Sequence, residues 1–174
     1  MQIAGILALL LVLFQANAMT QGALVPRLEY SASLGCGDVF FHARNTAKTE
    51  VLRIAADVAR VQSPAAEQVF DLAALPTGVM VDITLYRYPQ INRPNCDDVV
   101  LTEVGALPNP PQVWLPVGGR LEIERGPRGV RPEEPWLFKT TIRLLGARFR
   151  GPNGREVSMS EPFTWEGFVG WQAG

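Results

Sequence analysis

The sequence predicts an all-β protein: a single antiparallel β-sandwich of two sheets, with about seven to nine strands and one disulfide. Three observations lead to this prediction. Apolar and polar residues alternate in several short runs, turn-forming residues separate these runs, and no run of comparable length has helical periodicity. The chain has 174 residues, a length typical of one domain with its own core.

Residues 1–18 are expected to be a secretory signal peptide. An uncharged apolar run from Ile3 to Phe14 is followed by Ala16 and Ala18, the small residues that a signal peptidase recognises. The run has about twelve residues, short of the roughly 20 that span a bilayer, so cleavage is favoured over a retained anchor. We therefore expect a secreted or periplasmic protein without membrane insertion, with a lead-in at 19–28 and the β-sandwich domain at 29–174.

The strands are predicted from period-two patterns. In residues 79–85 aliphatic side chains occupy alternate positions, while Asp82 and Thr84 fall on the opposite face, as a half-buried strand requires. Further runs of this kind lie at 52–58, 99–101, 121–123, 138–144 and 163–171.

Turn residues separate these runs. Gly151-Pro152-Asn153-Gly154 predicts a hairpin, because proline fixes one turn dihedral and Asn-Gly accepts positive φ. Gly146, beside a switch of apolar face, predicts a bulge within one strand. The pair Gly118-Gly119 and the spaced pair Gly126 and Gly129 lack the following helix of a phosphate loop, so turns are expected there.

Residues 70–78 lead through Pro76 and Gly78 into the predicted strand at 79–85. This segment resembles the strand, Pro-Gly corner, strand connection that crosses between sheets in immunoglobulin-like sandwiches. The resemblance implies an immunoglobulin-like or related Greek-key sandwich. It implies no function, because many unrelated folds share such a corner.

The two cysteines, Cys36 and Cys96, are expected to form a disulfide, since an oxidising compartment favours pairing. Closing a loop of about sixty residues would stabilise the fold by roughly 4 kcal/mol in the chain-entropy model. The alternative, free thiols at a metal or redox site, lacks a Cys-x-x-Cys spacing.

The sole histidine, His42, follows Asp38 by four residues and raises the possibility of catalysis. With Ser158 or Ser160 as nucleophile, the pair could form an acyl-transfer site. However, residues four apart on a strand are about 13 Å apart, and no nucleophile-elbow motif is present. A small hydrolase using His42 is therefore a minor alternative, and no catalytic residues are assigned.

Carboxylates near the cysteines suggest a possible calcium site. A Cys36–Cys96 bridge would bring Asp97 and Asp98 near Asp38, and Ca²⁺ accepts six to eight oxygen ligands. The simpler interpretation is that Asp97 and Asp98 cap a turn.

Two tryptophans, Trp114 and Trp136, lie beside proline-rich loops and are the candidates for an exposed aromatic surface that binds a glycan or a peptide. The formal net charge is −1, which argues against a nucleic-acid partner. The sequence thus predicts a non-catalytic binding or assembly module with a protein or glycan partner, contacted through loops around 91–98, 107–114 and 126–136. A calcium-supported carbohydrate-binding module is the alternative.

Overall fold

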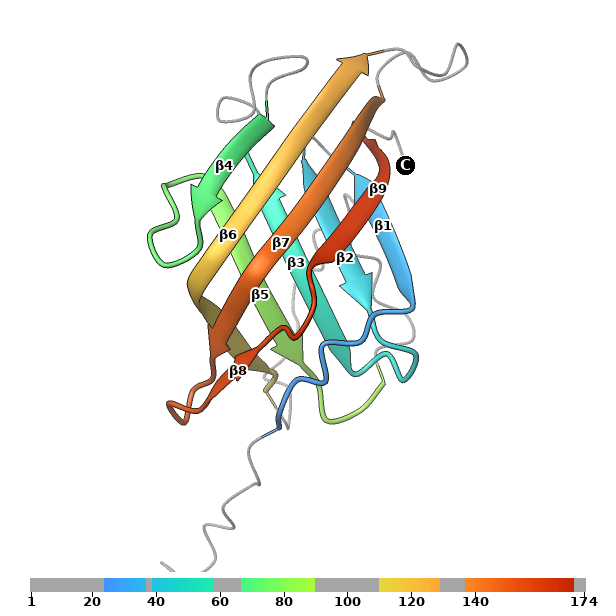
Figure 1. Cartoon of the computed structure of the whole chain (residues 1–174). Helices are drawn as coiled ribbons and strands as arrows, with labels where there is room; N and C mark the ends of the chain where they lie inside the picture. Colours follow the sequence, from blue (N-terminus) through green and yellow to red (C-terminus); the bar gives the residue numbers. More distant parts are fainter. Residues whose placement is uncertain (1–23, 37–38, 58–66, 90–109, 129–136, 171–174) are drawn as a thin grey trace, which may run out of the picture.

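The computed structural model describes residues 24–36, 39–57, 67–89, 110–128 and 137–170, and these residues form strands, turns and extended segments without a helix (Figure 1). Every paired strand is antiparallel to its neighbour, so the predicted all-β class is confirmed. The strands are β1 (Ala32–Cys36), β2 (Phe40–Arg44), β3 (Glu50–Ala56), β4 (Glu67–Asp71), β5 (Val79–Leu85), β6 (Gln112–Arg128), β7 (Phe138–Arg150), β8 (Glu156–Ser158) and β9 (Phe163–Val169).

Hydrogen bonds join all nine strands into one sheet with the order β1-β2-β3-β5-β6-β7-β8, in which β4 also pairs with β6 and β9 with β7. The sheet has two parts, one made of β1, β2, β3 and β5 and the other of β4, β7, β8 and β9. Strand β6 links them, because its start pairs with β5 and its later portion pairs with β4. Figure 1 shows β4, β6, β7 and β9 lying across β1, β2, β3 and β5. The sheet therefore folds over on itself, and the separate two-sheet immunoglobulin-like arrangement stays a prediction.

Bulges allow the long strands β6 and β7 to bend. Their register shifts between Gly118 and Arg120, where β7 contains the extra residue predicted at Gly146. Gly119 and Gly146 have φ values of 102° and 57°, a region that favours glycine. The predicted turn at Gly118-Gly119 is wrong, because both residues lie inside β6; a glycine pair serves a bulge as well as a turn. Gly126 also lies inside β6.

Apolar side chains from both parts of the sheet meet in one core. The Phe41 ring of β2 lies 4.7 Å from the Trp165 ring and 5.8 Å from the Phe163 ring of β9, centroid to centroid. Among the described residues, the largest fully buried side chains include Trp114 of β6 and Phe149 of β7. The core is thus filled by aromatic and aliphatic groups packed between the two parts.

Two predicted turns are present: the hairpin at 151–154 and the Pro-Gly corner before β5. In the hairpin between β7 and β8, the Gly154 N–H donates to the Gly151 carbonyl at 2.9 Å, and Gly154 has a φ of 80°. At the Pro-Gly corner, the Val79 N–H donates to the Pro76 carbonyl at 3.1 Å. Since β4 pairs with β6 while β5 pairs mainly with β3 and, at its end, with the start of β6, this corner carries the chain from one part of the sheet to the other.

Candidate functional site

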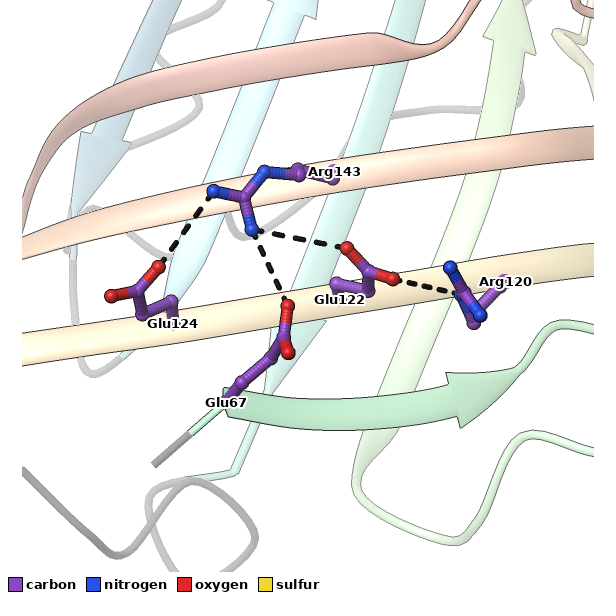
Figure 2. Close-up of polar contacts among 5 residues, drawn as sticks. All are labelled: Glu67, Arg120, Glu122, Glu124 and Arg143. Carbon is purple, nitrogen blue, oxygen red and sulfur yellow. Dashed lines mark hydrogen bonds and ion pairs between the residues drawn. The ribbon is translucent and has the colours of Figure 1, made fainter. Parts of the chain in front are cut away.

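The outer face of β4, β6 and β7 carries a network of ion pairs (Figure 2). The Arg143 guanidinium of β7 lies among three carboxylates, at 3.3 Å from Glu67, 3.7 Å from Glu124 and 3.8 Å from Glu122. Arg120 lies 2.8 Å from Glu122. Because side chains on alternate positions share a face, the sheet register brings these residues from three strands together.

Carboxylates outnumber guanidinium groups in this network, three to two. Glu122 lies between the two arginines and is 8% exposed, whereas Glu67 and Arg143 keep substantial contact with water. Partly exposed pairs of this kind each stabilise a fold by about 0.2–1 kcal/mol, so the network mainly orients its side chains. With the exposed Asp71 at the end of β4, four carboxylates beside β4 meet two guanidinium groups, while the exposed Lys139 of β7 lies on the same face beyond the start of β4.

Strand β4 forms the margin of this face. Among the strands that the structure describes, β4 pairs only with β6. Its outward residues Glu67, Val69 and Asp71 are exposed, and Val69 is one of the most exposed large apolar residues at 55%. We refer to residues 67–71 as the β4 edge. An exposed edge strand offers its backbone hydrogen-bonding groups to another chain.

A second distinctive region is the extended segment 24–31, which contains the described part of the predicted lead-in and is called the lead-in from here on; the buried carboxylate of Glu50 attaches it to the sheet. The Arg27 N–H donates to Glu50 Oε2 at 2.8 Å and the Leu28 N–H donates to Oε1 at 2.9 Å, while Leu28 has a φ of 63°. Burial, and then the negative charge of Glu50, raise the pKa of Tyr30 far above its usual range. The lead-in therefore packs against the core through a specific polar contact.

Open hollows flank the lead-in, and Arg27 lines each of three. The largest measures about 480 Å³ and lies against Asn45, Thr46 and Ala47. Another, of about 430 Å³, includes Ser158 and Ser160. These hollows lie at the surface and contain none of the catalytic pairs considered from the sequence.

The histidine is buried. His42 of β2 is 5% exposed, next to Phe40 and paired in register with Arg53 of β3. Burial, and to a lesser extent the charge of Arg44, lower the pKa of His42 to about 4, so its imidazole is neutral near pH 7. Ser158 and Ser160 line a surface hollow whose lining residues do not include His42.

The predicted aromatic surface is not present at Trp114, which is fully buried in the core. Its ring packs so closely on Gly151 that a Cβ at that glycine would lie 2.6 Å from the indole. Trp114 therefore offers no ring face to a ligand in this structure, which corrects the expectation of exposure. Trp136 lies outside the described residues.

The remaining predicted residues also lie where the structure gives no side-chain description. They are Asp38, Asp97 and Asp98 of the suggested calcium site, and Cys36 and Cys96 of the expected disulfide, although Cys36 itself ends β1. Within the described part of the chain, no group of three His, Cys, Asp or Glu side chains could hold a metal ion. In the same residues, no helix is long and apolar enough to cross a membrane.

Comparison of the chain with protein-family models, curated proteins and solved structures finds no significant match in any of the three. A functional conclusion therefore rests on the residues and geometry of the chain itself. The sequence pattern missed both the Glu50 contact and the Arg143 network. Glu122 and Glu124 were visible as outward residues of a strand, but their partner on β7 depends on the sheet register.

Proposed function

We propose that this protein is an exported, non-catalytic binding or assembly module of the cell envelope or extracellular space. The observation that carries the proposal is the contrast between a filled interior and an open sheet margin. Trp114, Phe41 and Phe149 fill the core, so a partner would meet the outer surface. There the β4 edge and the charged face beside it offer backbone and side-chain groups for recognition.

The burial of His42 supports a non-catalytic role. A general base must reach the proton that it abstracts, directly or through one water. An imidazole that is 5% exposed and keeps a pKa of about 4 is poorly placed to meet a substrate from solvent. The hydrolase alternative would need a rearrangement that exposes the ring.

The proposal of export is based on the apolar run and small residues within residues 1–18. The proposal of a two-sheet fold is based on the crossing at the Pro-Gly corner. We propose that cleavage follows Ala18, so that the mature chain begins at Met19. We also propose an immunoglobulin-like two-sheet arrangement pinned by a Cys36–Cys96 bridge. N-terminal sequencing of the protein recovered from the periplasm or medium tests the cleavage; a first residue other than Met19 contradicts it.

The binding role is tested by affinity capture with the mature protein, using envelope and medium fractions of the native cells. We expect a partner whose recovery falls when excess untagged mature protein competes. The control for catalysis is a panel of ester substrates assayed with the wild type and the His42→Gln variant. Turnover that depends on His42 would contradict the proposal, as would the absence of any competed partner.

A further inference from the structure

We infer that the β4 edge binds an extended, basic segment of a partner protein, which adds to the sheet as a further strand. This inference rests on the proposed binding function and names the class of partner. Three features of the described residues carry it: the direction of the backbone groups on β4, the charge of the face beside β4, and the poor fit of a second copy.

The hydrogen-bond pattern shows which backbone groups of β4 face away from β6. The Leu72 N–H donates to the Gly119 carbonyl at 3.0 Å, in register with the β4–β6 pairing. In an antiparallel pair, hydrogen-bonded and non-hydrogen-bonded positions alternate. Phe70 and Gln68 therefore bond to β6, whereas the N–H and C=O groups of Val69 and Glu67 point to the free side.

The free part of the edge is short. At Asp71 the chain turns, since the Asp71 carbonyl accepts from the Ala74 N–H at 3.1 Å and its side chain accepts from the Ala73 N–H at 2.9 Å. Glu67 and Val69 thus offer both their N–H and C=O groups away from β6, and Asp71 offers only its N–H. Because so few main-chain bonds can form, recognition must also depend on side chains.

The side chains on this face favour a cationic strand. Glu67 and Asp71 flank the exposed Val69, and the neighbouring β6 adds Glu122 and Glu124. Arg143 and Arg120 neutralise part of this charge but leave two carboxylates in excess. An incoming strand with basic, apolar and basic residues at alternate positions would place complementary side chains opposite Glu67, Val69 and Asp71.

A second copy of this chain fits the edge poorly. Antiparallel pairing of two β4 strands about Val69 would set Glu67 of one copy directly opposite Asp71 of the other, twice. Like charges at directly opposed positions destabilise a strand pair. Charge complementarity therefore assigns the edge to a basic segment of another protein.

The test uses a capped peptide of sequence Lys-Thr-Val-Thr-Lys, with Glu-Thr-Val-Thr-Glu as its matched control. Isotope-labelled mature protein is titrated with each peptide to millimolar concentration, and backbone amide shifts are recorded. We expect the basic peptide to shift the amides of β4 and of residues 120–124 and to slow hydrogen exchange at Val69. Binding should weaken as ionic strength rises to about 0.3 M, because the charges are near the surface. Equal binding of the acidic peptide, or shifts confined to other strands, would overturn the inference.

Two variants sharpen the test. Val69→Pro removes an N–H that points away from β6, so it costs the fold no ladder bond, and edge strands tolerate proline. It should weaken peptide binding about tenfold, the effect of losing one or two main-chain bonds. Val69→Lys keeps every backbone hydrogen bond and repels a cationic strand. It replaces the proline variant in the binding test if that variant is unstable. Unchanged affinity in a folded variant would contradict the β4 site.

Further outcomes separate this inference from the proposed function. A captured partner that binds Val69→Pro as well as wild type would overturn the edge site while leaving the binding role intact. No captured partner would contradict the binding role itself. A dimer of the mature protein that Val69→Pro dissociates would assign the edge to a second copy and overturn the basic segment.

Discussion

The contact between Glu50 and the lead-in yields a quantitative prediction. Replacing Glu50 by glutamine keeps the shape of the side chain but leaves one carbonyl oxygen in place of two carboxylate oxygens. The wild-type carboxylate accepts one bond from the Arg27 N–H and another from the Leu28 N–H, at 2.8 and 2.9 Å. In the variant one of these donors must face the amide NH₂, which cannot accept a hydrogen bond.

The magnitude follows from burial. Glu50 is 2% exposed, so water does not replace a lost partner. A hydrogen bond to a charged group contributes about 1.5–3 kcal/mol, and Glu50→Gln loses one bond and weakens the other. We expect Glu50→Gln to lower the free energy of unfolding by about 2–3 kcal/mol, and Glu50→Ala, which loses both bonds, by about 3–5 kcal/mol.

The assay combines urea unfolding with amide hydrogen exchange. The Arg27 and Leu28 amides should exchange much faster in Glu50→Gln, because the lead-in no longer has its anchor. Glu29→Gln is the matched control, since it makes the same chemical change at an exposed position of the lead-in and should be within about 0.5 kcal/mol of wild type. Unchanged stability and unchanged amide protection in Glu50→Gln would refute the anchoring role.

Four other perturbations have definite expected outcomes. Since the pKa of His42 is lowered to about 4, wild-type stability should be intact above the unfolded-state pKa of 6.5, fall by up to about 3 kcal/mol between pH 6.5 and 4, and level off below that range, where both states are protonated. The His42→Gln variant should lack this pH-dependent loss of stability in urea unfolding. A pH profile identical to that of the wild type would contradict the lowered pKa of His42. Gly35→Ala should destabilise the fold by about 1–3 kcal/mol, because its Cβ would lie 2.6 Å from the Phe168 carbonyl oxygen; a neutral effect in thermal unfolding would count against that close approach. Intact mass after alkylation without reductant should be unchanged if Cys36 and Cys96 are paired, and a mass gain excludes the bridge. Excess EDTA should lower the melting temperature if calcium is bound; no shift removes the calcium hypothesis.

Elements with a strict local pattern could be predicted from the sequence. The strand at 79–85 coincides with β5, because its alternation is complete and a glycine with φ of 86° precedes it at Gly78. The bulge at Gly146 was visible as a switch of apolar face, and the 151–154 hairpin follows from turn chemistry alone. In each case the information lies within a few consecutive residues.

Features that depend on the register between strands could not be predicted. Trp114 lies between Val113 and Leu115, so three apolar residues in a row give no alternation. In the structure, however, Val113 and Leu115 are 38% and 58% exposed and only the tryptophan is buried. Glu50 begins β3 as a charged residue, and nothing nearby in sequence identifies the amides of Arg27 and Leu28 as its partners. The Arg143 network likewise requires β4, β6 and β7 to be aligned first.

The approach of β1 to β9 has a consequence for how the chain folds. Gly35 and Phe168 come from opposite ends of the described chain, yet their backbones are close enough that only glycine fits between them. Contacts between such distant residues form late, because the loop entropy must be overcome first. Until β9 is in place, Phe41 lacks its cover from Phe163 and Trp165. Without β9 the inner face of β2 would be exposed, so we expect the partly folded chain to be open to proteolysis until the contact between β1 and β9 has formed.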